Sequence, residues 1–130
     1  MTCTHHSQTD ATGTFDTLEN SDAGLRVRIH RTGAEMVSLA RRSGSAGEWQ
    51  GFLHRDNLTT PPTSGWANHA TVMGYFVHRL VDERSQYRDA TITGGNHGFL
   101  RHFEFDTPEF DASSGSLTYR VAADAIPPDA

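Results

Sequence analysis

Residues 25–40 read LRVRIHRTGAEMVSLA, and this stretch decides the fold class. Apolar residues alternate with polar ones over residues 25–29, which is the period of two of a half-buried strand. The pair Thr32-Gly33 predicts a turn, and a second apolar strand follows over residues 34–40. The segment therefore predicts two antiparallel strands that open a mainly β domain.

The rest of the chain is rich in short strand patterns. We expect strands at residues 48–53, 87–93, 99–105 and 117–121, with a hairpin turn through residues 111–116 before the last of them. Residues 71–81 form an apolar run, for which a helix over residues 70–80 is the weaker alternative because β-branched and aromatic residues dominate it. The sequence has no heptad pattern and no internal repeat, so the predicted class is mainly β.

The two ends of the chain are expected to lie outside the folded domain, which we place at residues 21–124. Residues 1–20 are mostly polar, and we expect a flexible leader there. Residues 125–130 contain Pro127 and Pro128, which cannot donate the backbone hydrogen bonds that a sheet requires. We therefore expect an irregular tail at residues 125–130.

The composition limits which partners the chain is expected to bind and where in the cell it is expected to lie. The chain has 130 residues, a net charge of −5 and a pI near 5.8. It has no positive excess for nucleic acid or an anionic membrane surface, and we expect neither as a partner. Cys3 is the single cysteine, which excludes an internal disulfide. Without an export signal or the roughly 18 apolar residues of a membrane span, the chain is expected to be cytoplasmic.

Residues 94–105 read GGNHGFLRHFEF and carry the candidate functional residues. On an extended strand, residues an even number apart share a face. His97 and Arg101 would then lie on one face with three phenylalanines, and His102 on the other. Because the two histidines would point apart, and because no cysteine or carboxylate stands at ligand spacing, we expect no metal site and no cofactor.

Two interpretations of this aromatic surface remain open from the residues alone. In the first, Arg101 stacks on an aromatic ring or pairs with Glu104 or Asp106, and His97 bonds to a backbone carbonyl. In the second, His97 and Arg101 line a cleft that takes a polyhydroxylated ligand, and the aromatic surface packs against the apolar face of a sugar ring.

Four further segments follow one another along the chain, and they read GAEMVSL at residues 33–39, GEWQGFLHRD at 47–56, YFVHRL at 75–80 and HGFLRHFEF at 97–105. In this order they resemble the aldose 1-epimerase (galactose mutarotase-like) family, in its branch with a His-Gly-Phe-x-Arg motif. The match covers residues 21–120. The resemblance implies an antiparallel β-sandwich, here part of a galactose mutarotase-like supersandwich.

Family membership would imply an isomerase that interconverts the α and β anomers of an aldose or of a hexose 6-phosphate. The reaction needs a general base at the anomeric hydroxyl and a general acid at the ring oxygen. In the family these are a glutamate and a second histidine from segments later than those matched here. We therefore expect this chain to be the N-terminal portion of such a protein, weakly active or inactive alone.

The resemblance also assigns roles to individual residues. Arg79 matches an arginine that hydrogen-bonds sugar hydroxyls, and its guanidinium can donate two parallel bonds. His97 matches the first active-site histidine, which binds and polarises the sugar near its ring oxygen. Arg101, His78 and Trp66 are expected to support the site, the last from a long loop that borders it.

Rival functions remain beside the epimerase interpretation. A non-catalytic sugar-binding module and a self-assembling β module both fit a sheet with exposed edges. A small metal-binding β protein is a further alternative. The partners expected are thus a monosaccharide or hexose phosphate, together with a second copy of the chain or a complementing C-terminal chain.

Overall fold

The computed structural model describes residues 2–44, 46–53 and 70–126. Its regular structure is mainly antiparallel β-sheet, which confirms the predicted class. Within these ranges, the helical elements are three short 3₁₀ turns at Val81–Glu83, Leu100–His102 and Ala123–Ala125. None of the helices in the described residues is long and apolar enough to cross a membrane.

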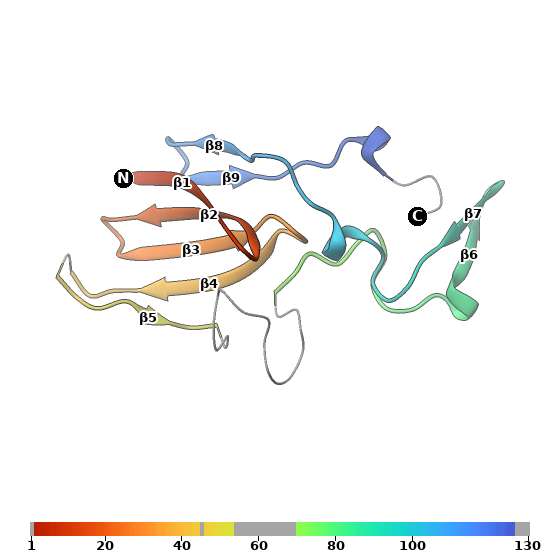
Figure 1. Cartoon of the computed structure of the whole chain (residues 1–130), viewed down its shortest axis with the longest axis horizontal. Helices are drawn as coiled ribbons and strands as arrows, with labels where there is room; N and C mark the ends of the chain where they lie inside the picture. Colours follow the sequence, from red (N-terminus) through yellow and green to blue (C-terminus); the bar gives the residue numbers. More distant parts are fainter. Residues whose placement is uncertain (1, 45, 54–69, 127–130) are drawn as a thin grey trace.

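One five-stranded sheet dominates the fold (Figure 1). Its strands follow the chain in the order β1-β2-β3-β4-β5, and each pairs antiparallel with the next. Their bounds are Cys3–Asp10 for β1, Gly13–Asn20 for β2, Leu25–His30 for β3, Glu35–Arg41 for β4 and Gln50–Gly51 for β5. The predicted pair at residues 25–40 is therefore confirmed as β3 and β4, while only two residues of the expected strand at 48–53 pair.

The N-terminal residues correct the expectation of a flexible leader. Strands β1 and β2 form a regular hairpin with eight paired positions, joined by a two-residue turn. The Asp10 carboxylate fixes this turn, because it accepts hydrogen bonds from the N–H and the hydroxyl of Thr12, both at 2.7 Å. Threonines in the hairpin favour extended backbone, and the polar composition reflects strands with one solvated face.

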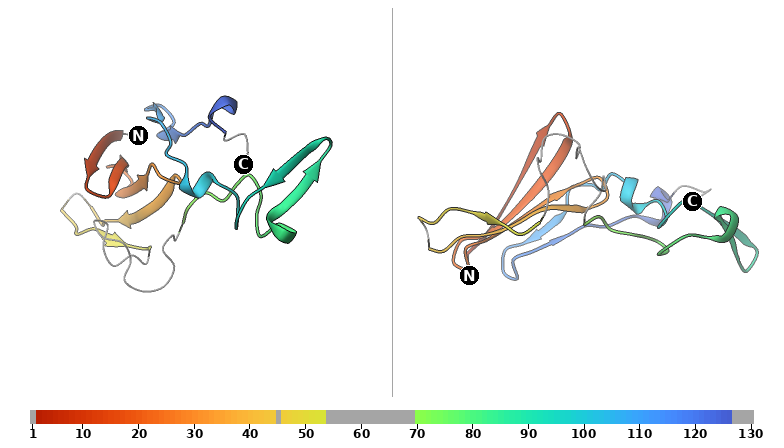
Figure 2. Two further views of the ribbon diagram at one scale, coloured as in Figure 1. Left: turned by 45° about the vertical axis from the view of Figure 1, so that its right-hand side comes forward. Right: turned by 90° about the horizontal axis from the view of Figure 1, so that it is seen from below.

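The second half of the chain makes two small hairpins. Strand β6 (Arg84–Tyr87) pairs with β7 (Ala90–Thr93), and β8 (Glu109–Asp111) pairs with β9 (Ser116–Thr118), as Figure 1 shows. The β8–β9 hairpin lies beside β1 and β2, whereas β6–β7 projects from the far end of the molecule (Figure 2). The apolar run at residues 71–81 does not form the alternative helix, and its last residue begins the 3₁₀ turn Val81–Glu83.

Trp49 holds the segment before β5 against the sheet. The guanidinium of Arg26 in β3 lies 4.2 Å from the centroid of the Trp49 ring, and that of Arg42 lies 4.6 Å from it. Such contacts contribute about 0.5–2 kcal/mol each, depending on how far they are removed from water. They add an anchor for residues whose ladder to β4 is only two pairs long.

The apolar core is small. Four hydrophobic side chains are buried in the described residues, namely Phe15, Val37, Ala40 and Phe105. Asp16 is also fully buried, with an exposed fraction of 0%. A buried carboxylate is costly unless charges and hydrogen bonds compensate it, so its partners are central to stability.

Asp16 is compensated by four side chains from three parts of the chain. The partners of its carboxylate are His5 Nε2 at 2.9 Å, Ser7 Oγ at 2.6 Å, Arg31 Nε at 2.8 Å and Nη2 at 3.0 Å, and the Tyr119 hydroxyl at 2.9 Å. His5 and Ser7 belong to β1, Arg31 follows β3, and Tyr119 follows β9. We call these five residues the Asp16 network.

The charge state of the network follows from these contacts. Burial by itself raises the pKa of Asp16, but the hydrogen bonds from Arg31, Ser7, His5 and Tyr119 outweigh it, and the pKa lies well below its ordinary 3.8. Burial, followed by the bond to Asp16, raises the pKa of Tyr119 far above 10.0. Asp16 is therefore ionised and Tyr119 is a neutral donor.

A series of aromatic rings runs from Tyr119 to Tyr75. Neighbouring ring centroids lie 5.9, 5.1, 6.1 and 5.8 Å apart, all in edge-to-face contact, and the rings belong to Tyr119, Phe105, Phe103, Phe99 and Tyr75. We call this series the aromatic ladder. Each such pair contributes about 0.5–1.5 kcal/mol beyond area burial. The ladder connects the Asp16 network with the candidate site.

Acid should weaken the fold through Asp16. Its pKa is lower in the folded chain than in the unfolded chain, so below about pH 4 the unfolded chain binds the proton first and stability falls with pH. We expect urea unfolding to show full stability near pH 6 and a loss of more than about 1 kcal/mol by pH 2.5.

Two aspartates beside hairpin turns, Asp10 and Asp111, provide the control for this prediction. Hydrogen bonds from Thr12 lower the pKa of Asp10, and those from Ser113 and Ser114 lower the pKa of Asp111 to about 2. A chain with both Asp10→Asn and Asp111→Asn should keep most of the acid-induced loss. If the loss disappears in this variant, Asp16 is not its source.

Candidate functional site

The candidate site forms where two distant segments are bound together. Residues 74–78 and 97–100 flank the β6–β7 hairpin, and backbone hydrogen bonds join them. Gly74 N donates to His97 O at 3.0 Å, Leu100 N donates to Gly74 O at 3.2 Å, and His97 N donates to His78 O at 2.8 Å. His97 therefore lies at the centre of this junction.

The His97 ring takes part in the junction as well. The backbone N–H of His78 donates to His97 Nδ1 at 2.8 Å. An imidazole nitrogen that accepts a hydrogen bond carries no proton, so in the neutral ring the proton lies on Nε2. The contact thus fixes both the ring position and the tautomer, and it makes Nε2 a hydrogen-bond donor.

The backbone at the junction is left-handed. The φ angles are 84° at His78, 63° at His97 and 70° at Gly98. A Cβ at Gly98 would overlap the carbonyl oxygen of Gly74. Glycine at position 98 is therefore required both by its φ angle and by the close approach of the facing backbone.

These angles correct the expected strand at residues 99–105. The chain turns at Gly98 and forms the 3₁₀ helix Leu100–His102, so strand parity does not apply. Arg101 and His102 do not point to opposite sides, because Arg101 Nε donates to His102 Nε2 at 2.9 Å. Glu104 accepts a bond from the Thr32 hydroxyl instead of pairing with Arg101.

The other predicted site residues differ in where they lie relative to His97. His78 contacts His97 as described, although through its backbone rather than its ring. Arg79 follows His78 directly and is exposed. Trp66 lies outside the described residues. The structure thus brings His97 and His78 together with Arg79 adjacent in sequence, while Arg101 bonds to its neighbour.

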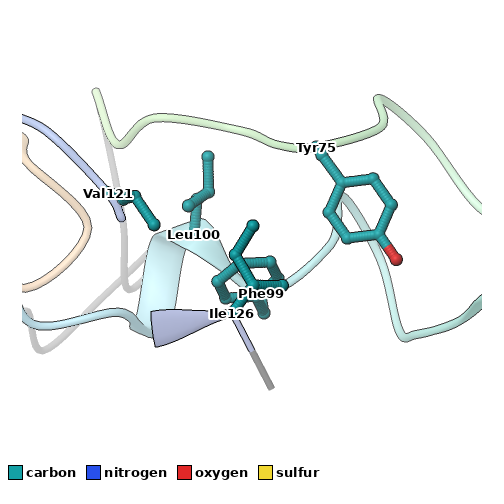
Figure 3. Close-up of a pocket in the computed structure, with 5 residues that line it drawn as sticks. All are labelled: Tyr75, Phe99, Leu100, Val121 and Ile126. Atoms are coloured by element: carbon teal, nitrogen blue, oxygen red, sulfur yellow. The ribbon is translucent and has the colours of Figure 1, made fainter. Parts of the chain in front are cut away.

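An apolar pocket of about 270 Å³ adjoins the junction. Its lining residues are Tyr75, Phe99, Leu100, Val121 and Ile126. In the view of Figure 3, Tyr75 lies on one side of Phe99 and Val121 on the other. Tyr75 and Phe99 are also members of the aromatic ladder. The pocket wall therefore begins two residues after His97.

The segment before His78 exposes further apolar side chains. Met73 is 50% exposed, Tyr75 45% and Val77 71%. Contiguous exposed apolar residues on a folded protein commonly mark a binding surface. Within the described ranges, no group of three or more histidine, cysteine, aspartate or glutamate side chains is arranged to bind a metal ion.

Comparison with known proteins adds no assignment. No family model matches the sequence, and neither the curated proteins nor the solved structures contain a match.

The sequence analysis missed the Asp16 network. Its members are spread from β1 to the residue after β9, and Asp16 and Tyr119 are 103 positions apart. One local signal for the first hairpin was present in the sequence. Residues 10–13, Asp-Ala-Thr-Gly, suit a tight hairpin turn, and the threonine-rich segment directly after them contains the apolar Phe15 and Leu18.

Substitution at Gly98 tests the junction. Gly98→Ala should lower the free energy of unfolding by about 1–3 kcal/mol, because the new methyl group meets Gly74 in a strained backbone conformation. Gly95→Ala is the matched control, since a Cβ there meets open space, and its effect should stay within about 0.5 kcal/mol. Equal effects of the two substitutions, measured by urea unfolding, would contradict the junction described above.

Proposed function

We propose that this chain is a carbohydrate-binding module of the aldose 1-epimerase type, in which His97 and Arg79 bind a monosaccharide or hexose phosphate. In this proposal residues 21–120 form part of a mutarotase-like β-supersandwich. The general base and the second histidine of the epimerase reaction would come from segments outside the matched residues. The module thus supplies binding and polarisation of the sugar.

One observation carries the proposal, namely the bond from His78 N–H to His97 Nδ1. It presents Nε2 with its proton, which suits an imidazole that donates to a sugar ring oxygen or hydroxyl. A histidine ring fixed through one nitrogen loses little further freedom when the other nitrogen binds a ligand. The fixed ring is therefore preorganised for hydrogen bonding.

The surroundings support a sugar as the ligand class. Tyr75 and Phe99 provide aromatic surface next to the junction, and the pocket that they line is apolar. Sugar rings present an apolar C–H face together with polar edges, so aromatic side chains and a few oriented donors are the usual complement. Arg79 adds a guanidinium suited to two adjacent hydroxyls or to a phosphate.

His97→Asn separates binding from folding. Asparagine tolerates the left-handed φ of 63° at this position, and its amide oxygen can accept the His78 N–H in place of Nδ1. It lacks the donor at Nε2. We therefore expect unchanged stability and about tenfold weaker sugar binding, the effect of one lost hydrogen bond.

NMR titration with glucose, galactose and glucose 6-phosphate would measure this change at the His97 ring and the Tyr75 amide. His102→Asn is the control, since it removes an exposed imidazole outside the junction and should leave affinity unchanged. The proposal fails if none of these sugars shifts the His97 signals, or if His97→Asn binds them as the unsubstituted chain does.

A further inference from the structure

Strand β1 forms one edge of the five-stranded sheet. Its only strand neighbour in the described part of the chain is β2, and its eight-residue register with β2 is continuous. The strand contains no proline, lysine or arginine, and Asp10 is its one formally charged residue. Natural edge strands commonly carry charges, prolines or bulges that prevent pairing with another chain. β1 has none of these along its first seven residues.

The register identifies the backbone groups on the open side. In an antiparallel pair, residues bonded to the neighbouring strand alternate with residues whose N–H and C=O point away from it. Ser21 N donates to Thr2 O, and the register then assigns the even-numbered residues of β1 to bonds with β2. The outward groups are therefore those of Cys3, His5, Ser7 and Thr9.

We propose that β1 pairs antiparallel with β1 of a second copy of this chain, about a two-fold axis at His6. This register places Cys3 opposite Thr9 and His5 opposite Ser7, so all the outward groups gain partners. His6 of one copy then faces His6 of the other in a non-hydrogen-bonded pair, with Cα atoms about 4.5 Å apart. The charges fit the register too, since each Asp10 faces Thr2 and the two carboxylates lie at opposite ends.

The side chains of β1 divide between the two faces of the sheet. His5 and Ser7 lie on the face of the hairpin that carries Asp16, where the ring of Phe110 in β8 lies 5.6 Å from that of His5. His6 lies on the other face, one position along the strand, and it is exposed. The β8–β9 hairpin therefore packs on one face of β1, and the paired histidines would lie on the opposite face.

Cysteine cross-linking tests the register directly. In a Cys3→Ser background, His6→Cys should form a disulfide-linked dimer under mild oxidation, because a non-hydrogen-bonded pair has the Cα separation that a disulfide needs. Thr4→Cys, on the same face two residues away, would face Gln8 of the second copy and should stay unlinked. The proposal is overturned if His6→Cys remains monomeric, or if both variants cross-link equally.

A second variant tests the pairing without oxidation. Light scattering of the unsubstituted chain should give twice the monomer mass of 14.3 kDa. Thr9→Pro removes an outward N–H and the side-chain bond to Thr14, while leaving every backbone bond to β2 intact. It should return the chain to monomer with unchanged circular dichroism. A monomeric unsubstituted chain, or a Thr9→Pro variant that remains a dimer, would each refute pairing through β1.

Discussion

The fold depends on one buried charge. Asp16 is wholly inaccessible, whereas few hydrophobic side chains are buried in the part of the chain that the structure describes. Donors from β1, from the residue after β3 and from the residue after β9 satisfy its carboxylate. Breaking a buried ion pair typically costs about 3–5 kcal/mol, which is a large part of the stability of a small domain. The carboxylate therefore connects the N-terminal hairpin with the C-terminal hairpin, a task that a larger apolar core performs in most proteins.

The position of the candidate site depends on the Asp16 network. Tyr119 donates to Asp16 and contacts Phe105, the first of the rings that lead to Phe99 and Tyr75 at the pocket. His97 is then fixed beside these rings by backbone bonds to residues 74–78. The elements that form the site have little regular structure, so aromatic contacts and the two glycines of the junction determine its geometry.

The sequence predicted what depends on local pattern and missed what depends on distant contacts. The alternation at residues 25–29 identified β3, and the predicted turn through residues 111–116 identified the turn of the last hairpin. The strand before that turn is β8, and not the expected strand at residues 99–105. Polar β1 lacked an apolar alternation, so its hairpin was mistaken for a leader. At the site, His97 and the backbone of His78 lie together, but strand parity failed because Gly98 turns the chain where the pattern assumed a strand.

A double-mutant cycle between Asp16 and Tyr119 tests the central claim most directly. Asp16→Asn, Tyr119→Phe and the combined variant would be unfolded in urea near pH 7. If the carboxylate holds the C-terminal hairpin on the sheet, the two substitutions should be coupled by at least about 1 kcal/mol. Strictly additive effects would show that the two residues stabilise the chain independently and would contradict the account.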